Sequence, residues 1–295
     1  MEASKNLILV SIILVNYNGA DVLPSCLNSL NKFLPQDSCE IILVDNDSQD
    51  NSVDFVSKNF PDIKIIRMSK NCGFGAGNNA GAKIAQGEFL FLLNTDIILT
   101  ENILPHLIEL MEKRQDVGII GTKLLFPDQS FQLSISSAIG IKGEFKSKKL
   151  HNIANNKYNA SCLEKDYKLI REVDIVVGAS MFIRAKLFED LCGFDERFFM
   201  YFEDSDLCQR SQNQGYKILY TPEVSVIHIR GHSMKKNPHA MALEYRRSQM
   251  YYYEKHRPVW ESAILKVYLF FKFISEYIKT RKSYILDILL LLVGK

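Results

Sequence analysis

The first half of the chain alternates short apolar runs, rich in β-branched residues, with segments of helical periodicity. This alternation constrains the fold strongly, because strands that are apolar along their whole length must be covered on both faces. Connecting helices provide that cover and make neighbouring strands parallel. The predicted strands are 7–15, 40–45, 63–67, 88–93 and 117–120, and the predicted helices are 21–34, 50–59, 75–86 and 101–114. The sequence therefore predicts an α/β fold with a mainly parallel sheet between helices.

The pattern changes after residue 126. Residues 127–171 are rich in Lys, Ser and Asn and show little periodicity, which indicates a long excursion or a lid rather than a linker. Beyond them the predicted strands are 173–177, 180–183, 217–220 and 224–229, with helices at 203–212 and after residue 238. We therefore expect a main domain of residues 1–238, with halves 1–126 and 127–238, and a helical extension of residues 239–295.

Charge and cysteine content exclude several classes of protein. Lys and Arg number 36 against 34 Asp and Glu, so the chain lacks the positive excess of a nucleic-acid-binding protein. The six cysteines are scattered without a CxxC pair, and we interpret them as reduced and cytoplasmic.

The apolar run 7–15 resembles a signal-peptide core, but polar residues 16–19 stand where the cleavage site belongs. No run is long enough to span a membrane, so we expect neither a secreted nor an integral membrane protein.

Polar residues follow three of the predicted strands at their carboxyl ends. These clusters are Asn16-Tyr17-Asn18, Asp45-Asn46-Asp47-Ser48 and Asn94-Thr95-Asp96. Parallel sheets bind ligands at this edge, so the clusters are expected to meet in one site. Asp96 is a candidate ligand for Mg²⁺ or Mn²⁺, because a cation that bridges two phosphates needs few protein ligands. The alternative is that Asp96 only caps a turn.

A glycine-rich segment, residues 71–81, follows the third predicted strand. Closely spaced glycines allow the backbone to approach a ligand before a helix begins. Gly75, Gly77 and Ala80 also fit a GxGxxA pattern, so a dinucleotide-dependent oxidoreductase is an alternative interpretation. That fingerprint usually follows the first strand of its unit, whereas two strand-helix pairs precede it here.

Three acids, Glu203, Asp204 and Asp206, follow an aromatic run. Acids favour helix N-termini, but three acids behind four bulky apolar residues exceed what capping needs. They suggest a carboxylate that transfers a proton. Asp206 is expected to pair with Arg210 one turn later.

His228 ends a strand-like run and is a candidate for the metal or a diphosphate, although a lone histidine is more often structural.

In this order the motifs resemble glycosyltransferase family 2, and within it the rhamnosyltransferase-like branch that builds bacterial surface polysaccharides. The resemblance runs from Ser11 to about Lys255. It implies a GT-A fold with a nucleotide-sugar half and an acceptor half. It also implies an inverting, metal-dependent transfer from a nucleotide sugar, dTDP-rhamnose or a UDP-hexose, to a hydroxyl of a glycan or lipid-linked acceptor. The non-catalytic alternative is a sugar-nucleotide-binding scaffold of a polysaccharide assembly complex.

The resemblance also implies roles for individual residues. Tyr17 lies against the base of the donor, and either Asp45 or Asn46 bonds that base. Asp96 binds the metal, and His228 belongs to a histidine motif that closes the site. The other residues predicted to bind substrate are Asn18, Asn71, Gly73, Asn79, Asn94, Thr95, Gly178, Glu203 and Asp206.

The most specific block of the resemblance runs from Gly193 to Arg210. Within it, Asp204 corresponds by position to the catalytic base of the family. Gly231 and Ser233 resemble the remainder of the histidine motif.

The last fifty residues are basic and apolar. Residues 246–295 carry ten Lys and Arg against four acids, and lysines interrupt the apolar runs. Such a segment suits an anionic membrane interface. Packing on the main domain or on a second copy is the alternative. We therefore expect a cytoplasmic protein held peripherally on the inner face of the cell membrane, and an oligomer is compatible with the sequence.

Overall fold

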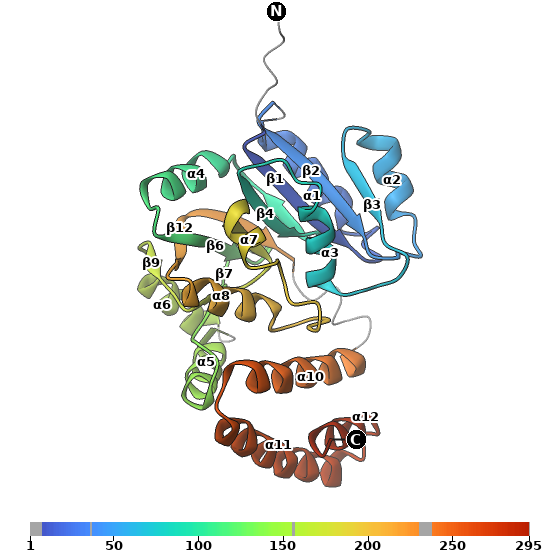
Figure 1. Ribbon diagram of the computed structural model, residues 1–295, viewed down its shortest axis with the longest axis vertical. Helices are drawn as coiled ribbons and strands as arrows, with labels where there is room; N and C mark the ends of the chain where they lie inside the picture. The colour runs from blue at the N-terminus through green and yellow to red at the C-terminus, as the bar shows by residue number, and fades with distance from the viewer. Residues whose placement is uncertain (1–7, 36, 155–156, 230–237, 295) are drawn as a thin grey trace, which may run out of the picture.

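The structure is a computed structural model that describes residues 8–35, 37–154, 157–229 and 238–294, without the side chains of residues 151 and 157–161. Figure 1 shows the α/β fold that the sequence pattern predicts. The first four strands are β1 (Val10–Asn16), β2 (Cys39–Asp45), β3 (Lys64–Arg67) and β4 (Phe89–Asn94). The helices between them are α1 (Leu23–Phe33), α2 (Ser52–Asn59) and α3 (Phe74–Ala82). Each of these predicted elements is confirmed.

The main sheet has the strand order β3-β2-β1-β4-β11-β6-β12-β5. The first four strands are parallel, and β11 (Ser180–Arg184) runs antiparallel between β4 and β6 (Val117–Leu125). β12 (Lys217–His228) is parallel to β6 and antiparallel to β5 (Ile97–Leu99). Because β11 opposes β4, the residues just before β11 lie beside the carboxyl end of β4.

Two buried clusters lie on opposite faces of the sheet. Leu27 of α1 and Leu107 of α4 (Leu104–Lys113) belong to the cluster that contains Leu14 of β1. α3, α7 (Ala185–Asp190) and α8 (Glu203–Asn213) contribute to the other, which contains Ile13. Leu14 and Ile13 belong to different clusters because successive side chains of a strand point to opposite faces.

Residues 127–171 are more regular than the sequence predicts. They contain the helices α5 (Ile141–Ala154) and α6 (Lys157–Asp166) and the short strands β7 (Phe131–Gln132), β8 (Ile135–Ser136) and β9 (Arg171–Glu172). β8 pairs with β10 (Ile175–Val176) outside the main sheet. Both helices are rich in polar residues, which explains why no apolar periodicity revealed them.

The prediction of two separate strands at 217–220 and 224–229 is wrong. One continuous strand, β12, covers both, and its register shifts between Thr221 and Ser225. Pro222 lies in this interval, and its missing N–H interrupts the ladder without ending the strand.

The helices predicted beyond residue 238 are α10 (Pro238–His256), α11 (Val259–Thr280) and α12 (Tyr284–Leu292). α10 lies between the main body and α11 (Figure 1). A third buried cluster joins Tyr252, Leu269 and Ile288 of these helices to Phe198 and Phe202, which precede α8. The extension therefore shares its core with the main body. Within the described ranges, no helix combines the length and the apolar character needed to cross a membrane.

Candidate active site

Asn16 joins the carboxyl ends of β1 and β2. Its Nδ2 donates to Asp45 Oδ1 at 3.2 Å and to the hydroxyls of Ser48 and Ser52 at 3.0 and 2.8 Å. Asp45 Oδ2 accepts a hydrogen bond from the Ser48 N–H at 3.2 Å. The two strand ends are therefore fixed relative to each other around a buried Asp45 carboxylate.

Tyr17 and Asn18 form the start of the loop after β1. Asn18 has a left-handed backbone, with φ 52°, which asparagine tolerates better than most residues. Its Oδ1 accepts a hydrogen bond from the Gln49 N–H at 2.7 Å, so its side chain connects two loops. Tyr17 keeps 47% of its surface exposed, and its ring is therefore accessible to a planar ligand.

Asn46 organises the start of the glycine-rich segment. Its Nδ2 donates to Asn71 Oδ1 at 2.9 Å and to the Gly73 carbonyl at 3.0 Å, and its Oδ1 accepts from the Cys72 N–H at 3.0 Å. Gly73 has φ +91°, and a Cβ there would lie 2.0 Å from the Phe199 carbonyl oxygen. This position therefore requires glycine, because no side chain would fit. These bonds use both N–H donors of the Asn46 side chain. Each carboxylate oxygen of Asp45 can accept a further bond, so Asp45 is the stronger candidate for the base contact.

The remaining glycines of this segment have a packing role. A Cβ on Gly77 would lie 2.6 Å from Val15 Cγ1, and one on Gly81 would lie 2.6 Å from Ile13 Cγ2. Glycine thus lets α3 pack closely against β1. The expectation that these glycines make room for a ligand is wrong, because protein atoms occupy the space beside them. The GxGxxA pattern consequently gives no support to the oxidoreductase alternative.

Asn79 connects α3 to the segment before α8. Its Oδ1 accepts from the Phe194 N–H at 2.8 Å, and its Nδ2 donates to the Phe194 carbonyl at 2.9 Å and to Glu196 Oε1 at 3.0 Å. Its amide is therefore already bonded to protein. The structure thus gives Asn79, predicted to bind substrate, a structural position instead.

A path of hydrogen bonds connects the end of β4 to α8. The N–H of Asn94 donates to the Ala179 carbonyl at 3.0 Å. The neighbouring Gly178 N–H donates to Asp204 Oδ2 at 3.1 Å. Asp204, from the second half of the chain, is thereby brought to the edge of the sheet where Asn94, Thr95 and Asp96 lie. This path brings Asn94, Gly178 and Asp204 close together at this edge of the sheet.

Asp204 and Glu203 are carboxylic acids in buried surroundings. Burial raises the pKa of Asp204, although hydrogen bonds from the Gly178 N–H and from Ser205 oppose this rise. Burial and the nearby Asp204 charge raise the pKa of Glu203 well above its usual range. Glu203 Oε2 has no hydrogen-bond partner among the described residues. Glu203 and Asp204 are thus adjacent acids with different surroundings, since Asp204 accepts hydrogen bonds from Gly178 and Ser205.

Asp96, in the turn between β4 and β5, faces His228 at the end of β12. His228 Nε2 lies 3.3 Å from Asp96 Oδ1, and both residues are largely buried. Gln132 Nε2 donates to the His228 carbonyl at 3.3 Å, which leaves Gln132 Oε1 to accept from His228 Nδ1 at 2.6 Å. In neutral imidazole this tautomer directs the Nε2 lone pair toward the carboxylate.

Two facing acceptor atoms are suited to share a cation. A histidine ligand to a metal commonly donates its other ring N–H to a polar group, which is the position of Gln132. Among the described residues, no three His, Cys, Asp or Glu side chains are grouped to hold a metal ion. Asp96 and His228 would fit a cation that takes its other ligands from a diphosphate and water. Gly231 and Ser233, predicted to complete this motif, lie outside the described residues.

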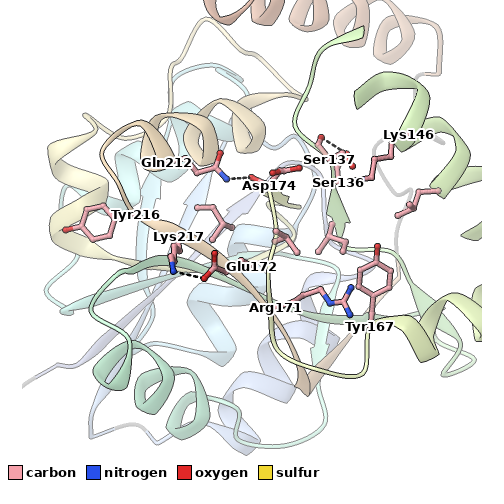
Figure 2. Close-up of a pocket in the computed structure, with 14 residues that line it drawn as sticks. Ser136, Ser137, Lys146, Tyr167, Arg171, Glu172, Asp174, Gln212, Tyr216 and Lys217 are labelled. Carbon is pink, nitrogen blue, oxygen red and sulfur yellow. Dashed lines mark hydrogen bonds and ion pairs between the residues drawn. The ribbon is translucent and has the colours of Figure 1, made fainter. Parts of the chain in front are cut away.

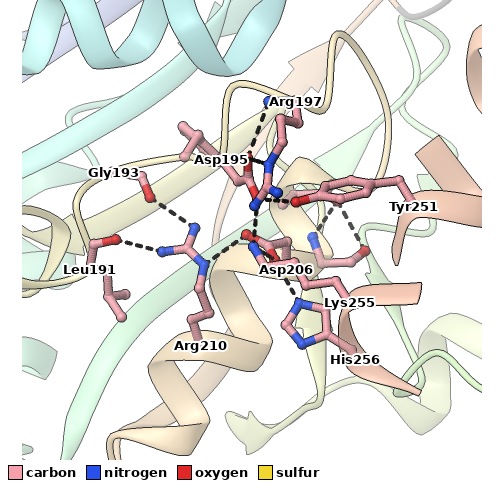
Figure 3. Close-up of polar contacts among 12 residues, drawn as sticks. Leu191, Gly193, Asp195, Arg197, Asp206, Arg210, Tyr251, Lys255 and His256 are labelled. Carbon is pink, nitrogen blue, oxygen red and sulfur yellow. Dashed lines mark hydrogen bonds and ion pairs between the residues drawn. The ribbon is translucent and has the colours of Figure 1, made fainter. Parts of the chain in front are cut away.

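Asp206 lies at the centre of a buried ionic network (Figure 3). Its Oδ1 lies 2.6 Å from both Lys255 Nζ and His256 Nε2, and its Oδ2 accepts from Arg210 Nε at 2.7 Å. The predicted pair with Arg210 is confirmed. Burial alone would raise the pKa of Asp206, but the His256 hydrogen bond and the Arg210 charge lower it. Because its side chain is fully buried, Asp206 stabilises the fold here instead of contacting substrate.

Two consecutive residues before α8 have left-handed backbones. Tyr201 has φ 70° and Phe202 has φ 68°. A non-glycine residue in this region costs about 1–3 kcal/mol, so packing around the turn must impose it. The Phe202 carbonyl accepts the Asp206 N–H at 2.8 Å and so begins α8. The strained turn therefore sets the position of the helix that carries Asp204.

A cavity of about 380 Å³ lies in another part of the fold (Figure 2). Arg171, Gln212 and Lys217 line it, together with residues of β8 and neighbouring segments. Lys217 and His228 are opposite ends of β12, about 35 Å apart at the rise of an extended strand. No residue of the predicted site lines this cavity, so it is separate from the site.

The sheet, its polar carboxyl edge and the carboxylates gathered there are those of a GT-A type glycosyltransferase. The sequence profile described as glycosyl transferase family 2 matches residues 11–191. This match covers more than half of the chain, and the chain belongs to that family.

Two curated relatives are named as rhamnosyltransferases. The chain is 23% identical to an N-acetylglucosaminyl-diphospho-decaprenol L-rhamnosyltransferase of Mycobacterium tuberculosis, over 87% of the chain and 88% of the relative. It is 26% identical to the rhamnosyltransferase WbbL of Escherichia coli, over 76% of the chain and 84% of the relative. These relatives confirm the resemblance to the rhamnosyltransferase-like branch and identify the protein as a glycosyltransferase.

Solved structures confirm the GT-A fold. A mannosyltransferase of Pyrobaculum calidifontis, in complex with GDP-Man and Mn²⁺, aligns with a TM-score of 0.58 at 18% identity, over 83% of this chain and 63% of that chain. TarS of S. aureus, in complex with UDP, aligns with a TM-score of 0.55 at 18% identity, over 82% of this chain and 64% of that chain. This chain thus spans just under two thirds of both structures.

Sequence reasoning missed several residues that shape the site. Gln132, which orients His228, lies on a two-residue strand inside the segment of faded periodicity. Lys255 and His256 lie far from any motif, so no local pattern links them to Asp206. Only a prediction of how α10 packs against α8 could have found them.

Proposed function

We propose that the protein transfers a sugar from a nucleoside diphosphate donor to a hydroxyl acceptor, with inversion at the anomeric carbon. The hydrogen-bonded path from Asn94 to Asp204 carries this proposal, because it puts a candidate base at the donor edge of the sheet. We favour dTDP-rhamnose as donor, with UDP-hexoses next, since two relatives are named as rhamnosyltransferases. The mycobacterial name also supports a lipid-linked saccharide acceptor.

The donor would lie across the carboxyl ends of β1, β2 and β4. In this proposal the exposed Tyr17 ring stacks on the base, and Asp45 accepts a hydrogen bond from it. Thr95 and Asn94 contact the sugar or ribose. A divalent cation bound at Asp96 and His228 would neutralise charge on the diphosphate.

Asp204 acts as the general base in this mechanism. The acceptor hydroxyl gives its proton to Asp204, and its oxygen bonds to the anomeric carbon from the face opposite the diphosphate. The bond to the diphosphate oxygen breaks, and that oxygen keeps the electron pair. One displacement of this kind inverts the carbon. Burial raises the pKa of Asp204, which makes it a stronger base than an ordinary aspartate.

Donor hydrolysis tests this function without a known acceptor. Wild-type protein with Mn²⁺ is incubated with dTDP-rhamnose, UDP-glucose, UDP-N-acetylglucosamine or GDP-mannose, and the released nucleoside diphosphate is measured. We expect release from one donor class, and the same donor should raise the thermal unfolding midpoint. Binding without hydrolysis by any donor would favour the scaffold alternative instead.

A second part of the proposal concerns the exposed face of α11. Beyond its first residue, Val259, this helix carries six bulky apolar side chains that are each at least half exposed: Trp260, Ile264, Val267, Tyr268, Phe271 and Ile278. Most of them are three, four or seven residues apart, with Val267 and Tyr268 adjacent, which puts them along one side of the helix. Lys272 and Lys279 are exposed on the same helix, and Lys282 is exposed just after it. Apolar surface flanked by cations suits an anionic lipid surface better than a second copy with the same charges. We therefore propose peripheral binding to the inner face of the cell membrane.

We expect the protein to cosediment with vesicles of phosphatidylglycerol and to dissociate from them as the NaCl concentration is raised. Val267→Glu combined with Phe271→Glu should abolish binding, since each apolar side chain contributes about 1.5–3 kcal/mol when buried. Phe145→Glu is the matched control, because Phe145 is equally exposed but lies on α5. Unchanged binding of the double variant, or its conversion from dimer to monomer in gel filtration, would contradict the membrane assignment.

A further inference from the structure

The strained turn before α8 is covered by α10. Ser248 Oγ donates to the Met200 carbonyl at 2.8 Å. The Tyr245 ring lies 5.5 Å from the Tyr201 ring and 5.1 Å from the Phe202 ring, measured between centroids. Three consecutive residues of the turn are therefore held by one helix of the C-terminal extension.

The same helix also holds the first turn of α8. Lys255 and His256 contact Asp206 Oδ1, and Lys255 also donates to Asp195 Oδ2 at 2.7 Å (Figure 3). Tyr251 donates to Asp195 Oδ2 at 2.8 Å. α10 thus bonds to both sides of the segment that ends in Asp204, once through the strained turn and once through the ionic network.

We propose that α10 is a brace that holds Asp204 in its reactive position, with Ser248, Tyr245, Lys255 and His256 as positioning residues. This inference rests on the proposed function, in which Asp204 is the base. The left-handed residues Tyr201 and Phe202 would relax to common backbone angles if their contacts with α10 were removed. Such relaxation shifts the start of α8 and moves the Asp204 carboxylate away from Gly178 and from the donor edge. The donor contacts on β1, β2 and β4 are unaffected.

A merely structural α10 would have different contacts and different consequences. A helix that only anchors α11 and α12 has no need to contact the backbone of the turn. Removing one of its bonds would lower the unfolding midpoint without changing the catalytic rate of the folded fraction. The brace instead predicts a selective fall in kcat while the KM for the donor stays constant.

Donor hydrolysis by full-length variants distinguishes these cases, with the donor of the panel above that wild type hydrolyses fastest. Ser248→Ala should lower kcat about three- to tenfold, the equivalent of one hydrogen bond, and leave donor KM within about twofold. Ser262→Ala is the matched control, because Ser262 is also a buried hydroxyl of the extension and its Oγ has no hydrogen-bond partner among the described residues. It should leave kcat unchanged.

A glycine at the strained turn provides the decisive comparison. Tyr201→Gly removes the backbone penalty, so Ser248→Ala should lower kcat less than about twofold in that background. Lys255→Met should also lower kcat, and Lys255→Arg should restore it. Equal effects of Ser248→Ala in both backgrounds, or no difference between Ser248→Ala and Ser262→Ala, would overturn the brace.

Asp204→Asn, assayed in parallel, separates the two proposals. An inactive Asp204→Asn together with a fully active Ser248→Ala removes the brace and leaves the proposed function intact. A fully active Asp204→Asn overturns both.

Discussion

Replacing Asp204 by asparagine is expected to lower sugar transfer by about a hundred- to ten-thousand-fold while donor affinity stays nearly constant. The amide keeps the shape of the side chain but cannot accept the proton of the acceptor. Turnover at saturating donor and calorimetric binding of the donor measure the two quantities. Because burial raises the pKa of Asp204, the wild-type rate should climb with pH through a value above that of an ordinary aspartate. This rise of the rate with pH should be absent from Asp204→Asn.

The neighbouring acids are the controls for this assignment. Asp206→Asn should act mainly on stability and cost about 3–5 kcal/mol, because it leaves buried cations without their partner. The pKa of Asp206 is lowered in the fold, so its contribution is present above pH 4 and is lost as pH falls through the folded value. Glu203→Gln should be intermediate. Near-normal turnover of Asp204→Asn with an inactive Glu203→Gln would move the base to Glu203.

A chelator is expected to abolish activity, and Mg²⁺ or Mn²⁺ should restore it. A cation on the diphosphate stabilises the departing charge by several kcal/mol, so Asp96→Ala should lose at least about a hundredfold in rate. Mn²⁺-dependent binding of the donor, followed by calorimetry, should weaken in the same variant.

Asp62→Ala is the matched control for the metal, because it makes the same change in charge at an exposed position away from the sheet edge. It should leave both the rate and the metal dependence unchanged. Full turnover of Asp96→Ala in metal-free buffer would remove Asp96 and His228 from the mechanism.

Much of the fold could be predicted from the sequence because its signals are local. The strands β1, β2 and β4 are apolar on both faces, and α1 and α2 each have their own apolar periodicity. α5 and α6 were not predicted because their sequences are polar and their positions depend on contacts with distant segments. One such contact is the bond from the Ile141 N–H to Glu261 Oε2 at 3.2 Å.

The site was predictable where a residue follows a strand directly. Asp96 and Asp45 lie where the pattern put them, because the carboxyl ends of parallel strands share one edge. The glycines of α3 were wrongly assigned to a ligand. A helix that packs closely against Val15 and a backbone that lies close to a ligand both require glycine, so the sequence does not distinguish them. Asn79 and Asp206 were assigned to substrate because their buried partners come from segments that no local motif connects.

The cover that α10 gives to the strained turn also has a consequence for the order in which the enzyme becomes active during synthesis. The strands that would bind the donor are complete long before α10 leaves the ribosome, and N-terminal units generally fold first. Asp204 emerges about 3 to 10 s before His256 at ordinary elongation rates. During that interval the nascent chain would bind a nucleotide sugar without transferring it. Transfer would begin only after α10 has emerged and has packed against the strained turn.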